Sequence, residues 1–252
     1  MPERTVQHWR GVLSSDYWFG QLPSALADRL LSLATIRQFQ DGQALFFRGD
    51  APDGLYAVLS GTLRVAGVSQ DGKEALLTLL EPTTWFGEIS VFDKLPRTHD
   101  VSALGQATVL FVRMADLDAM LQADPQWWQH FGVLMAFKTR LFMINMEDQA
   151  LLSPEGRLAR RLFWMAQSSV QEQADGRVKL VVNQANLAAM LSMSRQTANR
   201  ALMALQQSGV VTVAYGSIEV LDTDRLADIA HLSPTERRML DQALSKPLPK
   251  SH

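Results

Sequence analysis

Four long side chains that hydrogen-bond readily and carry no negative charge lie close together near residue 200. They are Arg195, Gln196, Asn199 and Arg200. If the segment is helical, all four fall on one face of the helix. Base-pair edges in the major groove present donors and acceptors that arginine, glutamine and asparagine can pair with. This face therefore favours contact with double-stranded DNA.

The surrounding sequence predicts a helix–turn–helix that would hold this face outward. A first helix begins near Gln184, and a break follows at Ser192-Met193. Ser194 then stands at the N-cap of a second helix, where its hydroxyl can accept from the first-turn amides. Apolar residues of the second helix recur at helical spacing: Ala198, Ala201, Leu202 and Leu205. The predicted DNA-binding set is Gln184, Ser194, Arg195, Gln196, Asn199 and Arg200.

The local charge agrees with a nucleic-acid partner. The 252 residues carry 24 Lys and Arg against 26 Asp and Glu, a net charge of −2, which excludes coating of nucleic acid by bulk charge. Residues 153–221 alone carry seven basic and four acidic side chains, and residues 184–217 contain no acid. The alternative is an ordinary helical hairpin with a solvated polar face.

A second group of residues has the chemistry of an anion site. Its members are Gly87, Glu88, Ile89, Ser90, Arg97 and Thr98. The glycine allows close approach to the backbone, the glutamate can accept from a sugar hydroxyl, and the arginine can pair with a phosphate. A short helix starting here would present its amides to an anion. The alternative is a structural salt bridge between Glu88 and Arg97.

The elements that must position these residues fall into three consecutive regions of the chain. A helix is expected at Ser24–Leu33, followed by short strands between turns from about Ile36 to Val112, which is typical of an antiparallel barrel or sandwich. One long helix is expected from Pro125 to Leu151, with Asp124 as its N-cap. A helix from Ser153 to Ala166, a strand, the helix–turn–helix and a hairpin complete the chain.

The long helix carries two apolar stripes. One contains Trp127, Phe131, Leu134 and Leu141, and the other contains Trp128, Met135, Phe142 and Met146. Because a helix that is apolar on two sides must be covered on two sides, one stripe is expected on the barrel and the other on a second copy of the chain. The alternative is that both stripes pack within one subunit.

Composition narrows the class of protein further. With no cysteine, the chain has no disulfide, thiol nucleophile or cysteine-held metal cluster, and the barrel segment has His99 as its single histidine. We therefore expect neither a catalytic nor a metal site. The polar N-terminus and the shortness of every apolar run predict a soluble, cytoplasmic protein that does not bind membranes.

The motifs, and the order in which they follow one another along the chain, resemble those of the cyclic-AMP receptor protein/FNR (Crp/Fnr) family of bacterial transcription regulators. The resemblance extends from about Phe39 to Leu221. It implies an α+β fold with an N-terminal cyclic-nucleotide-binding-like β-roll (jelly roll), a long dimerisation helix and a C-terminal winged helix–turn–helix. The corresponding divisions are residues 1–123, 124–152, 153–222 and a helical extension at 223–252. The family also implies a homodimer on an inverted-repeat operator, with RNA polymerase as a partner.

The resemblance further implies a small effector that controls the protein allosterically, with a hinge at Ser153-Pro154. Gly87, Glu88, Arg97 and Thr98 match the positions that hold ribose and cyclic phosphate in nucleotide-binding members. Strand alternation would place His99 on the same face as Arg97. These expectations concern the phosphate side of the effector pocket.

The base side of the pocket differs from the cyclic-AMP members. Those members read adenine with adjacent polar residues late in the long helix, where this chain has Phe142-Met143. Asn145 is the nearest polar candidate. The effector is then a cyclic nucleotide, another nucleotide or none. The iron–sulfur cluster of FNR-type members is excluded because the chain lacks cysteine.

One position of the recognition helix also departs from the family. Arg195 and Arg200 match its guanine-reading arginines, but Gln196 stands where many members have glutamate. Glutamate accepts from the cytosine amine, whereas glutamine suits adenine. The operator half-site is therefore expected to differ at that base pair from the one the cyclic-AMP receptor reads.

Beyond the hairpin, Ser233-Pro234-Thr235-Glu236 predicts a capped helix to about Leu244, with Lys246–His252 disordered.

Overall fold

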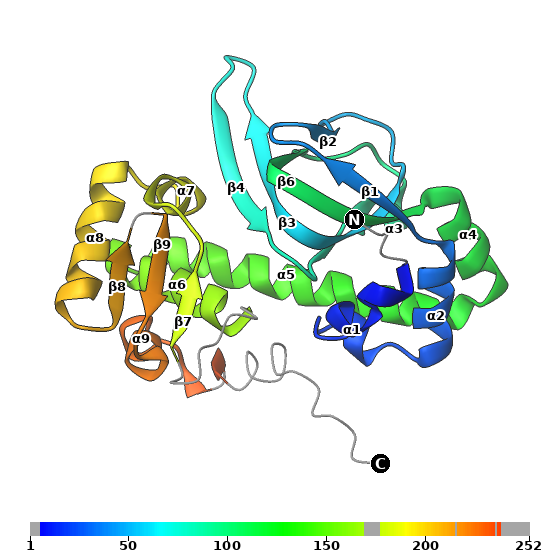
Figure 1. The fold of residues 1–252 in the computed structure, drawn as a ribbon. Helices are drawn as coiled ribbons and strands as arrows, with labels where there is room; N and C mark the ends of the chain where they lie inside the picture. The colour runs from blue at the N-terminus through cyan, green and yellow to red at the C-terminus, as the bar shows by residue number, and fades with distance from the viewer. Residues whose placement is uncertain (1–5, 169–176, 215, 235, 238–252) are drawn as a thin grey trace, which may run out of the picture. The chain divides into compact units, whose positions relative to one another are not determined.

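Six antiparallel strands build the N-terminal part of the chain (Figure 1). They are β1 (Thr35–Phe39), β2 (Ala44–Phe46), β3 (Gly54–Val68), β4 (Glu74–Leu80), β5 (Trp85–Phe86) and β6 (Asp100–Arg113). The path runs β1-β6-β3-β4, with β2 also paired to β6 and β5 to β3. The computed structural model describes residues 6–168, 177–214, 216–234 and 236–237. These strands confirm the predicted β-roll.

The structure divides into two compact units within the long helix, after Leu141. Each unit has its own apolar core. In the described residues, no helix has the length and apolar character needed to cross a bilayer.

The β-roll is held by apolar side chains on both faces of its longest strand. Within β3, Tyr56 and Val58 join one cluster and Leu55, Ala57 and Leu59 join the other, and all five are buried. A continuous apolar run in the sequence thus corresponds to a strand covered on both sides. Gly61 has φ +79°, and a Cβ there would lie 2.1 Å from the carbonyl oxygen of Gln106, so this position requires glycine.

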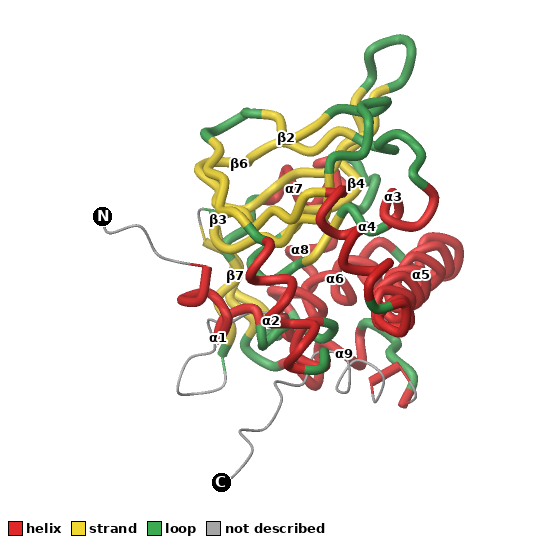
Figure 2. Tube along the Cα trace, turned by 90° about the vertical axis from the view of Figure 1, so that its right-hand side faces the viewer, coloured by secondary structure: helices red, strands yellow, loops and turns green. Residues whose placement is uncertain are grey.

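Helices cover one face of the roll (Figure 2). They are α1 (Arg10–Leu13), α2 (Ser24–Leu33), α4 (Met114–Ala123) and the first part of α5 (Trp128–Leu151), with 3₁₀ turns at Val6–Trp9, Phe19–Gln21 and Pro125–Trp127. Trp18 anchors the N-terminal segment, because its ring meets Trp85 and Phe131 and its indole donates to the carbonyl of His130 at 2.7 Å. The helix at Ser24–Leu33 is confirmed, whereas α4 was not predicted.

The long helix begins differently from the prediction. Asp124 accepts no capping hydrogen bond, and the chain makes a 3₁₀ turn over Pro125–Trp127 before α5. Proline suits the first position of that turn, since the amide that it lacks would have no partner there. Within α5, Phe131 and Leu134 are buried in the first unit.

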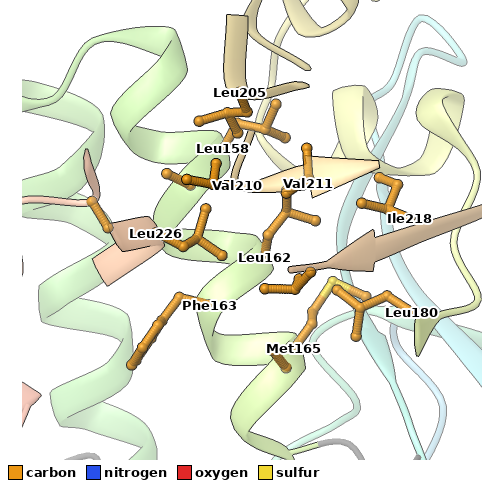
Figure 3. Close-up of a cluster of buried hydrophobic side chains, with 14 of the residues drawn as sticks. Leu158, Leu162, Phe163, Met165, Leu180, Leu205, Val210, Val211, Ile218 and Leu226 are labelled. Atoms are coloured by element: carbon orange, nitrogen blue, oxygen red, sulfur yellow. The ribbon is translucent and has the colours of Figure 1, made fainter. Parts of the chain in front are cut away.

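The second unit packs its helices and a small sheet around one apolar core. Its members are α6 (Pro154–Ser168), β7 (Val178–Leu180), α7 (Gln184–Met190), α8 (Arg195–Gln207), β8 (Val211–Ala214), β9 (Ser217–Val220) and α9 (Thr223–Ile229). The sheet order is β7-β9-β8. Leu158 and Leu162 of α6 meet Leu205 of α8 and Val211 of β8 in the core (Figure 3). The winged helix–turn–helix is therefore confirmed.

After α9, the Ser233 amide donates to Glu236 Oε2 at 2.8 Å and the Glu236 amide donates to Ser233 Oγ at 3.2 Å, which is the predicted capping box. The predicted continuation to Leu244 and the tail at Lys246–His252 lie outside the described residues.

Candidate DNA-binding face and effector site

The second helix of the helix–turn–helix, α8, separates a buried face from a polar one. Ala198, Ala201, Leu202 and Leu205 are buried against the core of the second unit. The opposite face is exposed and consists of Arg195, Gln196, Asn199 and Arg200. In the described part of the chain, none of these four makes a side-chain hydrogen bond or ion pair, so their donors and acceptors remain available to a ligand.

The N-terminus of α8 is fixed by its cap. Ser194 Oγ accepts from the Thr197 amide at 3.0 Å, as predicted. The turn before it has Ser192 at φ +51°, and the Met193 amide donates to the Ala188 carbonyl at 2.9 Å. These contacts fix the direction in which α8 leaves the turn, and with it the direction of the polar face.

Gln184 is the first residue of α7 and is exposed. It follows Asn183, whose side chain caps the helix by accepting from the Asn186 amide at 2.8 Å. Gln184 also lines a hollow of about 260 Å³ that is bordered by Gly216 and Ser217 of the hairpin. The hollow thus joins the start of the helix–turn–helix to the wing.

In the β-roll, Arg97 is the centre of the predicted anion site. Its side chain is 3% exposed and donates to Asp53 Oδ1 and to the Gly54 carbonyl, both at 2.6 Å. A third contact goes to the Gly87 carbonyl at 3.3 Å, and the guanidinium lies 4.4 Å from the ring centre of Phe46. The cation is therefore already compensated by a carboxylate of the same chain.

Gly87 is the close neighbour that makes this arrangement possible. Its φ is +93°, and a Cβ there would lie 2.9 Å from Arg97 Nη1 and 3.0 Å from the Gly54 carbonyl oxygen. A side chain at this position would thus displace the guanidinium.

Glu88 is also buried, but it pairs with a different element. Lys138 of α5 donates to Glu88 Oε2 at 2.7 Å. The alternative of a structural salt bridge between Glu88 and Arg97 is therefore wrong, because each has another partner of opposite charge. Arg97 contacts the carbonyl of Gly87, the residue before Glu88, so the two charged residues lie in one region without a direct bond between their side chains.

The remaining predicted effector residues differ in their burial and in the elements that carry them. Ser90 is buried and Ile89 is exposed, both in the short helix α3 (Ile89–Asp93), which is too short to concentrate a helix dipole. Thr98 is exposed, and its hydroxyl lies 3.0 Å from His99 Nδ1. Asn145 lies on the part of α5 that belongs to the second unit.

His99 does not lie beside Arg97 in the way that strand alternation predicts. The chain bends at Thr98 and His99, and β6 begins only at Asp100, so alternation does not apply there. The imidazole instead lies near Gly67. Burial, followed by the positive charge of Arg48, lowers the pKa of His99, whereas Asp100 works to raise it.

Two residues of the site were not among those predicted from the sequence. They are Asp53, which directly precedes β3, and Lys138, which lies within α5. In the structure, Asp53 also accepts from the Tyr56 hydroxyl and lies 3.7 Å from Arg37. Burial, then the hydrogen bond to Asp53, raises the pKa of Tyr56, which keeps the phenol protonated.

Family comparisons agree with the division into a β-roll and a helix–turn–helix. The profile of the cyclic nucleotide-binding domain matches residues 36–124, and that of the Crp-like helix-turn-helix domain matches residues 156–229. The chain belongs to the Crp/Fnr family of transcription regulators. The resemblance of the sequence motifs to this family is thereby confirmed.

Relatives of this Crp/Fnr regulator cover most of its length. It is 29% identical over 209 residues to the CRP-like cAMP-activated global transcriptional regulator of Mycobacterium tuberculosis, covering 82% of this chain and 93% of that protein. It is 28% identical over 203 residues to the cyclic AMP receptor protein of Thermus thermophilus, covering 81% and 91%. FixK2 from Bradyrhizobium japonicum has the same fold, with a TM-score of 0.70 at 18% identity over 79% of this chain and 98% of that chain.

These matches establish a DNA-binding transcription regulator with a cyclic nucleotide-binding domain. Its relatives are regulators rather than enzymes. The predicted anion site in the β-roll has one polar atom that an anion would suit, because Arg97 Nε is buried and has no hydrogen-bond partner in the described residues. One donor of the guanidinium therefore remains available.

Proposed function

We propose that this Crp/Fnr regulator is a cytoplasmic homodimer that binds an inverted-repeat operator and controls transcription together with RNA polymerase. The observation that carries the proposal is the exposed face of α8, where four polar side chains without negative charge have no partner in the described chain. Arg195 and Arg200 would pair with guanine, and Gln196 and Asn199 with adenine. Gln184 and the Ser194 end of α8 would contact the adjacent backbone.

The apolar surface of α5 supports the homodimer. Phe142, Met143 and Met146 are 62%, 59% and 52% exposed in the single chain. Large apolar side chains gathered on one helix favour a protein partner over water. A second α5 would supply an apolar surface of the same length, as predicted for the stripe that contains Phe142 and Met146.

Selection of binding sites from random DNA by the purified protein tests the operator. We expect an inverted repeat whose half-sites lie about one helical turn apart, roughly 34 Å. Arg195→Ala and Arg200→Ala should each weaken binding to that repeat by roughly tenfold or more, since a bidentate base contact is worth about 1–3 kcal/mol. Arg29→Ala removes the same charge from an exposed site on α2 and should leave the selected sequence unchanged.

We further propose that a cyclic nucleotide, or another small ligand with a phosphate, controls the regulator from the β-roll. The relatives from Mycobacterium tuberculosis and Thermus thermophilus are named for cyclic AMP. Arg97 and Thr98 would hold the phosphate, and Gly87 would allow its approach. Glu88 would accept from a ribose hydroxyl, with Ile89, Ser90 and His99 around them.

A regulator without an effector is the second candidate, and a specific observation favours it. Arg97 is already paired with Asp53 and Glu88 with Lys138, so both charges of the predicted site are compensated within the chain. An incoming phosphate must compete with Asp53 for the guanidinium, and a ribose must compete with Lys138 for the carboxylate.

Calorimetric titration with cyclic AMP, cyclic GMP and cyclic di-GMP separates the two candidates. Micromolar binding corresponds to about −8 kcal/mol. Such binding, lost in Arg97→Gln and kept in Arg64→Gln, would support the effector site, since Arg64 of β3 pairs with Glu74 of β4 and not with the predicted site. Absence of binding by all three, in protein that binds its operator, would support an effector-independent regulator.

A further inference from the structure

One arginine of the second unit, Arg160 on α6, joins three segments that are separate in the sequence. Its Nη1 donates to Asp148 Oδ1 of α5 at 2.6 Å and to Glu236 Oε1 at 2.8 Å. Its Nε and Nη2 donate to the Ala230 carbonyl at 3.1 and 3.0 Å, and Nη2 also donates to the His231 carbonyl at 3.2 Å. Every nitrogen of the guanidinium therefore has an acceptor.

The two carbonyls belong to the end of α9. His231 has φ +51°, a left-handed conformation that ends the helix, and the Leu232 amide donates to the Ala227 carbonyl at 3.2 Å. Carbonyl groups at a helix end lack intrahelical donors, and an arginine can satisfy them. Arg160 thus caps α9 while it bridges the two carboxylates.

The segment after α9 is shaped to present Glu236 to this arginine. One carboxylate oxygen accepts from the Ser233 amide and the other from Arg160. Burial works to raise the pKa of Glu236, but the hydrogen bonds from Ser233 and the charge of Arg160 outweigh it and lower the pKa. Glu236 therefore stays ionised at neutral pH, as an ion pair with Arg160 requires.

The positions of Asp148 on α5 and Arg160 on α6 allow their contact to restrict the angle between the two helices. Asp148 lies in the last turn of α5, and Arg160 lies in the second turn of α6. Only Leu152 and Ser153 separate the two helices. Because Asp148 and Arg160 lie on either side of so short a connection, a bond between their side chains restricts the angle of the corner.

The corner is also buried against the end of α9. A Cβ on Gly156, the third residue of α6, would lie 3.6 Å from the Ile229 carbonyl oxygen and 3.5 Å from Ser153 Oγ. Asp148 and Arg160 are 8% and 6% exposed, and burial raises the pKa of Asp148 to about 6 although Arg160 works to lower it. A buried cation that loses one carboxylate is poorly compensated, so the three segments depend on one another.

We propose that residues 230–234 and 236–237 form a clasp that holds Arg160 against Asp148 and fixes the corner between α5 and α6. Glu236 is a positioning residue in this clasp, and the segment beyond the winged helix–turn–helix becomes part of the path from α5 to the DNA-binding helices. The consequence for DNA binding rests on the proposed function, whereas the consequence for the corner does not.

Glu236→Gln in the full chain tests the clasp, because it removes the charge at nearly constant shape. Hydrogen exchange of peptides that cover residues 146–158 should become faster by about tenfold, the effect of losing a charge-assisted hydrogen bond. A chain that ends at Leu232 should show at least the same increase. Asp228→Asn is the matched control, since it breaks the exposed ion pair to Arg237 in the same segment without touching Arg160.

The second measurement is affinity for the selected operator, which should fall in Glu236→Gln and recover in part with Glu236→Asp. Equal exchange of the corner in Glu236→Gln and in the unchanged protein would overturn the clasp, whatever the truncated chain does. An equal increase in Asp228→Asn would overturn it as well, because the effect would then be general loosening of the segment. If the unchanged protein binds no DNA, the proposed function fails while the exchange result still decides the clasp.

Discussion

The guanidinium of Arg97 lies 2.6 Å from the carboxylate of Asp53, a residue 44 positions earlier in the chain. The arginine is 3% exposed, while the aspartate is 39% exposed. The pair therefore has one fully desolvated partner and one that solvent can still reach. In the effector proposal, the reachable carboxylate is the group that an entering anion must displace.

Replacing Asp53 with asparagine should expose this competition. Arg97 then loses its counter-ion, and the midpoint of thermal unfolding should fall, with a cost of about 1–3 kcal/mol for a buried charge left unsatisfied. Added inorganic phosphate should raise that midpoint more in Asp53→Asn than in the unchanged protein, because phosphate can act as the missing anion. Calorimetry with and without phosphate measures both effects.

A matched control for this experiment is Asp71→Asn, which removes an exposed carboxylate from the turn between β3 and β4. It should change neither the midpoint nor its response to phosphate. If phosphate stabilises Asp53→Asn and the unchanged protein equally, Asp53 does not compete with an anion for Arg97.

The contact between Glu88 and Lys138 should show strong coupling. Lys138→Met leaves the carboxylate of Glu88 buried without its cation, and the expected loss is about 1–3 kcal/mol in the free energy of unfolding. Glu88→Gln combined with Lys138→Met should cost less than the two single changes together, because no unpaired charge remains. Urea unfolding of the four proteins gives the coupling, and simple additivity would mean that the pair contributes nothing.

The sequence predicted the second unit better than the pairing inside the β-roll. The helix–turn–helix depends on local rules: Ser194 caps the helix three residues before the amide it binds, and the buried face follows from helical spacing. Helix α4 has the same kind of spacing at Leu117, Met120 and Leu121 but was not predicted.

The ion pairs of the roll follow from tertiary structure instead. Lys138 lies 50 positions from Glu88, and Asp53 lies 44 positions from Arg97, so neither choice can be read from nearby residues. Glu88 and Arg97 were the obvious pair of opposite charges because they are close in sequence. Their actual partners were set by the way β3 and α5 pack around the turn at Gly87.

The N-terminal segment should make stability depend on pH through Asp16. Burial raises the pKa of Asp16 to about 6 from 3.8, against hydrogen bonds from the amides of Phe19 and Trp18. Between pH 4 and 6 the folded protein therefore binds more protons than the unfolded chain, and stability falls as pH rises through this range. Asp16→Asn should lose this dependence and gain up to about 3 kcal/mol on the unchanged protein between pH 4 and pH 7.

Asp93→Asn is the control for this measurement, because Asp93 also accepts from a backbone amide, that of Leu95, but is exposed. Its pH dependence should match that of the unchanged protein. A stability curve for Asp16→Asn parallel to the unchanged one from pH 4 to 7 would show that the carboxylate does not take up a proton in the folded protein.

Gln196 should decide the preferred base at one position of each operator half-site. The side chain is exposed in the first turn of α8, beside Arg195, and has no partner in the described chain, so the DNA decides its hydrogen bonds. Glutamine offers an acceptor and a donor, which match the N6 amine and N7 of adenine, whereas glutamate only accepts and matches the cytosine amine. Gln196→Glu should therefore move the preference at one base pair of each half-site from adenine to cytosine, with a discrimination of about 1–3 kcal/mol.

Selection of binding sites by the two proteins measures this, and Gln207→Glu, an exposed change at the other end of α8, should leave the preference as it was. An identical preferred sequence for Gln196→Glu and the unchanged protein would mean that Gln196 does not contact a base.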